Sequence, residues 1–124
     1  MTFIAIIGLA VLLGLALFQL LLILGKPLGD FAWGGQYKVL PRKLRIASIC
    51  SIFLYIVFAT FLASKAGIVA IITQQPLLDI GMWIFTAYFM LGIFVNLISR
   101  NKKERALMTP VALVLAIVFL ITAL

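Results

Sequence analysis

The sequence predicts an all-α protein, an integral membrane four-helix bundle. Two thirds of the 124 residues are hydrophobic (66%) and 10% are charged, whereas a soluble domain is about 45–50% apolar and about 25% charged. The apolar residues also occur in long blocks, which the bilayer itself would cover. We therefore expect a single transmembrane domain over residues 1–124.

Four apolar blocks are long enough to cross the membrane as helices. They cover residues 3–24, 44–63, 77–98 and 108–124, and crossing about 30 Å of hydrocarbon takes roughly 20 helical residues. Their apolarity is continuous rather than alternating, which disfavours the strands of a membrane barrel. The first block lacks the basic start and the cleavage pattern of a signal peptide, so we expect it to remain in the mature protein.

Glycine and proline mark the predicted helix ends. Gly25 predicts a left-handed end for the first helix, and Pro41 and Pro76 suit the first turns of the second and third helices. Pro110 likewise predicts the first turn of the fourth helix, with Thr109 as its N-cap.

The segment 66–76 has two interpretations. Its apolar run at 68–72 is too short to span the membrane, so the segment either lies in the outer interface or continues the second helix as far as Thr73.

Small residues recur four positions apart, as at Ala10 and Gly14 and at Ala112 and Ala116. Such pairs let helices approach closely. We expect close helix contacts within the chain or between copies of it.

The basic residues predict the orientation. Five of the ten lie at 26–45 and four at 100–105, while the second connection holds only Lys65. Short basic loops remain cytoplasmic. We expect 25–43 and 99–107 to be cytoplasmic loops of a cell-membrane protein with both termini outside, and anionic lipid headgroups rather than nucleic acid to be the counter-charge.

The first connection is the primary candidate for function, because aromatic and basic side chains alternate in it and suit the headgroup layer. This candidate cytoplasmic interaction loop comprises Asp30, Phe31, Trp33, Tyr37, Lys38 and Arg42. A general aromatic belt beside a lipid-attracted basic loop would account for the same residues.

Uncharged polar residues form a second candidate site. Gln19, Ser48, Ser51 and Asn96 lie toward the cytoplasmic ends of their predicted spans, at similar depth. This candidate polar layer would either fix helix packing or line a pocket that faces the cytoplasm. No ionisable residue lies well inside a predicted span, which argues against a pump with a buried proton-carrying carboxylate.

Catalysis and metal binding have little support. The chain has no histidine, three acidic residues and one cysteine, Cys50, and an apolar span makes a thiol inert. We expect no catalytic, metal or cofactor-binding residues and no cofactor, and we regard an enzyme as the less favoured class.

Two stretches resemble those of small uncharacterised four-pass membrane proteins of bacteria. They are GKPLGDFAWGGQYKVLPRKLRIAS in the first connection and NLISRNKKERALMTPVALVLA in the last third of the chain. The resemblance implies a bacterial cytoplasmic membrane, and it implies no activity and no site residues.

Three function classes follow. The favoured one is a non-catalytic partner or regulator of a membrane assembly, which suits the basic and aromatic loop. The second is an oligomeric small-solute transporter or channel lined by the polar layer. The third is an interfacial lipid-modifying enzyme that uses Asp30, Tyr37, Lys38 and Arg42. The expected partners are membrane lipids and either another membrane protein or further copies of this chain.

Overall fold

The computed structural model describes residues 2–32, 35 and 37–124, and this part of the chain contains helices and no strands. The long helices are α1 (Thr2–Ile23), α2 (Arg42–Lys65), α3 (Gln75–Leu97) and α4 (Lys102–Ala123), and a short 3-10 helix, η1 (Gly29–Phe31), lies between α1 and α2. The predicted all-helical bundle of four long helices is confirmed. Each long helix is long and apolar enough to cross a membrane.

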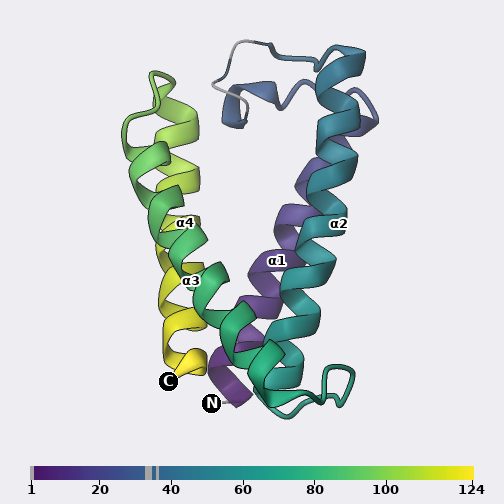
Figure 1. The fold of residues 1–124 in the computed structure, drawn as a ribbon. Coiled ribbons are helices and arrows are strands. Elements are labelled where there is room, and N and C mark those ends of the chain that lie inside the picture. The colour runs from purple at the N-terminus through teal and green to yellow at the C-terminus, as the bar shows by residue number, and fades with distance from the viewer. Residues whose placement is uncertain (1, 33–34, 36) are drawn as a thin grey trace.

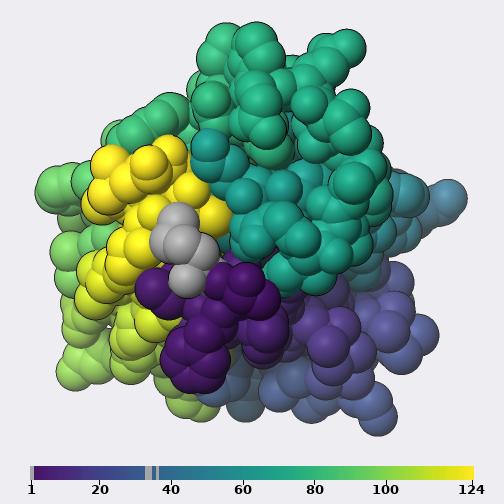
Figure 2. All heavy atoms as spheres, turned by 90° about the horizontal axis from the view of Figure 1, so that it is seen from below, coloured from purple at the N-terminus to yellow at the C-terminus, as the bar shows by residue number. Residues whose placement is uncertain are grey.

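The four helices form two hairpins. α1 packs mainly along α2 and α3 along α4, and the hairpins meet chiefly through α1 and α4. Figure 1 shows the hairpins close together at one end and apart at the other, where η1 lies between them. We call the first the terminal end, since it carries both termini and the connection 66–74, and the second the capped end. Figure 2 shows the terminal end, where the start of α1 (purple), the end of α4 (yellow) and the region between α2 and α3 (teal to green) are grouped together.

α1 and α2 each end near a glycine with left-handed backbone. Gly25 has a φ of 90° and Gly67 a φ of 78°, a conformation that glycine adopts without steric cost. The left-handed end predicted at Gly25 is therefore confirmed. α2 ends at Lys65, so the interpretation that continues this helix to Thr73 is wrong.

α4 begins at Lys102 rather than near residue 108. Its N-cap is Asn101, whose side-chain oxygen accepts a hydrogen bond from the backbone N–H of Glu104 at 3.0 Å, and Pro110 lies inside the helix. The predicted start at Pro110 with Thr109 as N-cap is wrong. The Asn-x-x-Glu sequence at 101–104 has the residue types of a capped helix start, and it outweighed the proline signal.

An aromatic cluster fills the space between the hairpins toward the terminal end. The ring of Phe58 lies edge-on to those of Phe85 and Phe89, with centroids 4.8 and 4.9 Å away, and 6.2 Å from that of Phe119. Phe58, Phe89 and Phe119 are all buried. The two hairpins are thus joined by interlocked rings.

Two glycines allow the close approach of helices at the same end. A Cβ atom on Gly8 would lie 2.6 Å from Cγ1 of Val118, and one on Gly81 would lie 2.2 Å from Cε2 of Phe61. A Cβ atom on Gly14 would meet nothing within 4 Å. Gly8 and Gly81 therefore make the close helix contacts, whereas Gly14 of the predicted Ala10 and Gly14 pair does not.

Candidate functional site

A cleft lies between the hairpins, on the capped side of the aromatic cluster. Its larger section has a volume of about 450 Å³ and its smaller section about 200 Å³. Leu15, Tyr55, Asn96 and Met108 line both sections, so the two adjoin. Ligand pockets usually measure about 300–1,000 Å³, and the cleft therefore has room for a small molecule.

The larger section is mostly apolar and is lined chiefly by α3 and α4. Leu115 and Ala112 form part of its buried wall. Tyr88, Leu91 and Val95 also line it, yet their side chains are 52%, 65% and 62% exposed. These three residues therefore form an open rim along α3.

The smaller section is the polar one, and every element contributes to it. Three of the four residues of the predicted polar layer, Gln19, Ser51 and Asn96, line this section. Ser51 and Asn96 donate hydrogen bonds to carbonyl groups of their own helices, at 3.2 and 2.8 Å. Ser48 is completely buried and is not among the lining residues.

Gln19 is the most buried of the polar residues that line the cleft in the described part of the chain. Its side chain is 7% exposed, and its Nε2 donates to the hydroxyl oxygen of Tyr55 at 3.4 Å. Its Oε1 is buried and has no hydrogen-bond partner among the described residues. A buried carbonyl without a donor costs free energy, so Oε1 is the unsatisfied group of the polar section.

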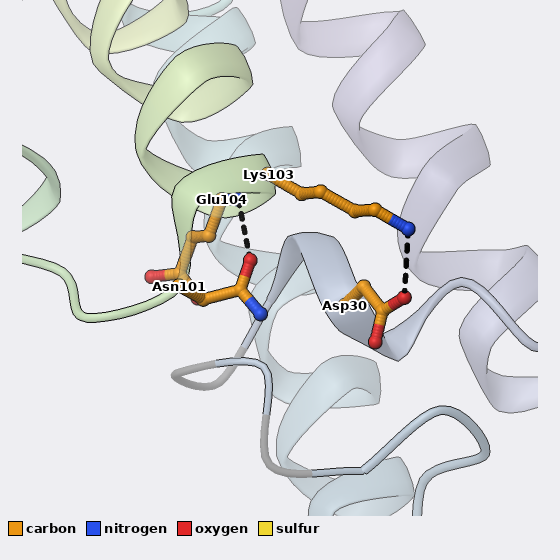
Figure 3. Close-up of polar contacts among 4 residues, drawn as sticks. All are labelled: Asp30, Asn101, Lys103 and Glu104. Atoms are coloured by element: carbon orange, nitrogen blue, oxygen red, sulfur yellow. Dashed lines mark hydrogen bonds and ion pairs between the residues drawn. The ribbon is translucent and has the colours of Figure 1, made fainter.

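The first connection closes the capped end of the cleft. The carboxylate of Asp30 in η1 accepts a hydrogen bond from Lys103 Nζ in α4 at 3.2 Å (Figure 3). The N–H of Gly29 donates to the carbonyl oxygen of Lys38 at 2.8 Å. A Cβ atom on Gly29 would lie 1.7 Å from the Tyr37 carbonyl oxygen, so this fold of the connection requires glycine there.

The residues of the predicted interaction loop have different environments. Phe31 is half-buried and lines the polar section. Asp30 binds Lys103, while Tyr37, Lys38 and Arg42 are exposed. Trp33 lies outside the described residues. The first part of the loop thus covers the cleft, and its last part faces outward.

Glu104 lines the polar section although it is not among the residues predicted for the site. Its side chain is 9% exposed. The available signal was its position three residues after Asn101, which places it in the first turn of a capped helix.

Comparison with family models, with curated proteins and with solved structures finds no match to this chain. Geometry and charge are therefore the basis for a functional proposal.

Charge differs sharply between the two ends of the molecule. Nine basic residues lie at the capped end: Lys26, Lys38, Arg42, Lys43, Arg45, Arg100, Lys102, Lys103 and Arg105. All but Arg45 are exposed, and Arg45 donates from Nε to the carbonyl oxygen of Leu40 at 2.8 Å. At the terminal end, Lys65 forms an ion pair with Asp79.

Proposed function

We propose that this chain is an integral protein of the cell membrane and that it acts without catalysis, as a partner or regulator of a membrane assembly. Its capped end would face the cytoplasm and both termini would lie outside. The observation that supports this proposal is the segregation of nine basic residues, eight of them exposed, at one end of four membrane-length helices. Basic connections between membrane helices remain on the cytoplasmic side.

The capped end has the properties of a docking surface. Among the described residues of the first connection, Gly29 is hydrogen-bonded to Lys38 and Asp30 is paired with Lys103, which links this connection to α4. Exposed cations on such a surface attract anionic headgroups and complement an acidic protein surface. The proposed partner is therefore a membrane protein with an acidic cytoplasmic surface, and lipid headgroups would neutralise the remaining cations.

Two observations bear on the other two classes. A path through a single chain would have to pass the rings of Phe58, Phe89 and Phe119, so an oligomeric transporter or channel would need its path between copies of the chain. In the cluster considered for a lipid-modifying enzyme, the carboxylate of Asp30 is already engaged by Lys103.

Cysteine labelling tests the orientation. Thr73 and Arg100 are exposed at opposite ends of the molecule, and each is replaced singly by cysteine on a Cys50→Ser background. An impermeant maleimide applied to intact cells should label Thr73→Cys directly and Arg100→Cys after permeabilisation alone. The opposite pattern would overturn the orientation.

Charge reversal tests the docking surface. Lys38→Glu/Arg42→Glu/Lys43→Glu changes three exposed cations, and Lys38→Arg/Arg42→Lys/Lys43→Arg keeps their charge. Each protein is purified in native nanodiscs from the host and analysed by mass spectrometry. A stoichiometric membrane protein should remain with the wild type and with the charge-conserving variant and be lost from the reversed one. Retention by all three, or no protein partner with any of them, would contradict the proposal.

A further inference from the structure

We propose that the cleft binds a single-chain amphipathic molecule with an uncharged hydrogen-bond-donor head, such as a long-chain primary amide or alcohol. Its head would lie in the polar section beside Gln19, and its chain in the apolar section along α3. The proposed docking function uses the basic surface of the capped end, and the binding site proposed here is a different part of the molecule.

The division of the cleft supports an amphipathic ligand. The larger section is walled by side chains such as Phe89, Val111 and Leu115, which suit an alkyl chain. The adjoining section brings together the side chains of Gln19, Ser51 and Asn96. Pockets that combine apolar walls with a few polar groups orient a ligand through those groups.

The unsatisfied carbonyl of Gln19 indicates the chemistry of the head. Gln19 lines the polar section, its side chain is more than nine-tenths buried, and its Oε1 has no donor among the described residues. A ligand N–H or O–H group would supply that donor after a small movement of the amide. The neighbouring Tyr55 hydroxyl, which already accepts from Gln19 Nε2, can donate in turn to an oxygen of the head.

The distribution of charge disfavours an anionic head. No lysine or arginine is among the described residues that line either section, although nine basic residues lie at this end of the molecule. The polar section instead includes the acidic residue Glu104. A phosphate or carboxylate head would leave water for this site without gaining a counter-charge.

The rim on α3 provides the entry route. Leu91 and Val95 line the cleft and are also exposed, so a chain can enter from the side. The first connection, tied to α4 by Asp30 and Lys103, covers the capped end. Given the membrane placement proposed above, the ligand would therefore come from the lipid phase rather than from the aqueous one.

Photolabelling in nanodiscs tests the site. The probe is a long-chain primary amide with a diazirine in its chain, and labelled positions are mapped by mass spectrometry. We expect labelling to be concentrated at 88–96 and 108–115. Gly92→Leu, which fills the apolar section, should reduce it at least about tenfold, whereas Gly14→Leu, which adds the same side chain where nothing lies within 4 Å, should leave it unchanged.

A second variant covers the case in which Gly92→Leu does not fold. Val95→Trp enlarges an exposed rim residue and Val57→Trp an exposed residue of α2 outside the lining. Only the former should reduce labelling. Labelling spread evenly over the exposed helix faces, or unaffected by both Gly92→Leu and Val95→Trp, would overturn the site.

Competition tests the head-group chemistry. Dodecanamide and N,N-dimethyldodecanamide share a chain and a carbonyl, but only the first has N–H donors. The first should compete about fivefold more strongly, as expected for one hydrogen bond. This preference should disappear in Gln19→Met and persist in the control Gln75→Met, which changes an exposed residue. Equal competition by both amides in the wild type, or stronger competition by dodecanoate, would overturn the donor head, while cysteine labelling reports separately on the membrane placement.

Discussion

The terminal end and the capped end join the same two hairpins by different means. At the terminal end, Gly8 and Gly81 bring helices into close contact and buried rings around Phe58 fill the space that remains. At the capped end, polar residues surround a cleft, and η1 with its ion pair to Lys103 bridges the hairpins. The contrast shows that packed side chains join the hairpins at one end, whereas a polar contact across a cleft joins them at the other.

The largest expected effect comes from the aromatic cluster. Phe58 is 1% exposed, and Phe58→Ala would leave a cavity between the hairpins. Because lipid tails are as apolar as the core, the cost comes mainly from lost contacts and the cavity, and we expect about 2 kcal/mol of lost stability. The measurement is unfolding by SDS in mixed micelles. Phe53→Ala, in the same helix but 66% exposed, is the control, and equal losses for the two variants would contradict this role of the cluster.

The glycine contact should have the next largest effect. Gly8→Leu inserts a side chain where a Cβ atom alone would lie 2.6 Å from Val118 and 2.8 Å from Leu62. Overpacking of this kind typically costs about 1–3 kcal/mol, and we expect the lower part of that range because the atoms that the Cβ would meet belong to side chains that can shift. The same unfolding assay should show no comparable loss for Gly14→Leu. If Gly8→Leu were as stable as that control, the close approach at the terminal end would not hold the hairpins together.

Those elements of the fold that depend on the neighbouring sequence alone were predictable. Long apolar blocks determine four helices, and Gly25 ends the first one, because neither depends on distant residues. The start of α4 was mispredicted, because Pro110 was weighed above the Asn101 and Glu104 pair. Helix ends of this kind depend on competing local signals, and the cap prevailed here.

The position of the candidate polar layer along the helices was predictable, but the side of each helix that faces the cleft was not. Sequence position places Gln19, Ser48, Ser51 and Asn96 at similar heights, yet Ser48 is not among the residues that line the cleft. Which side of a helix faces the cleft depends on contacts with helices distant in sequence. Gly8 and Gly81 make such contacts, and no local pattern distinguishes them from Gly14.

At the capped end, the N-cap of α4 should have a moderate effect. Asn101→Ala removes the side-chain oxygen that accepts from the N–H of Glu104, and loss of such a cap costs about 1 kcal/mol. Asn101→Asp, which retains an acceptor, should recover most of the lost stability in the same assay. Failure of Asp to recover it would show that the amide group, rather than the cap, is what matters.

The smallest energetic effect, and the most direct test of the contrast, concerns the two ion pairs. Asp30 with Lys103 and Lys65 with Asp79 each join one hairpin to the other, at opposite ends. Both are partly exposed, so each should contribute less than about 1 kcal/mol in a double-mutant cycle.

Their structural effects should differ, because the packed rings found among the described residues keep the hairpins together toward the terminal end. Spin labels at the exposed positions Ile46 and Leu97 report the distance between hairpins near the capped end. Asp30→Ala should broaden the distance distribution measured by double electron–electron resonance, and Asp79→Ala should leave it unchanged. Equal broadening by both variants would mean that the ion pairs, rather than the packed rings and glycines, set the separation of the hairpins.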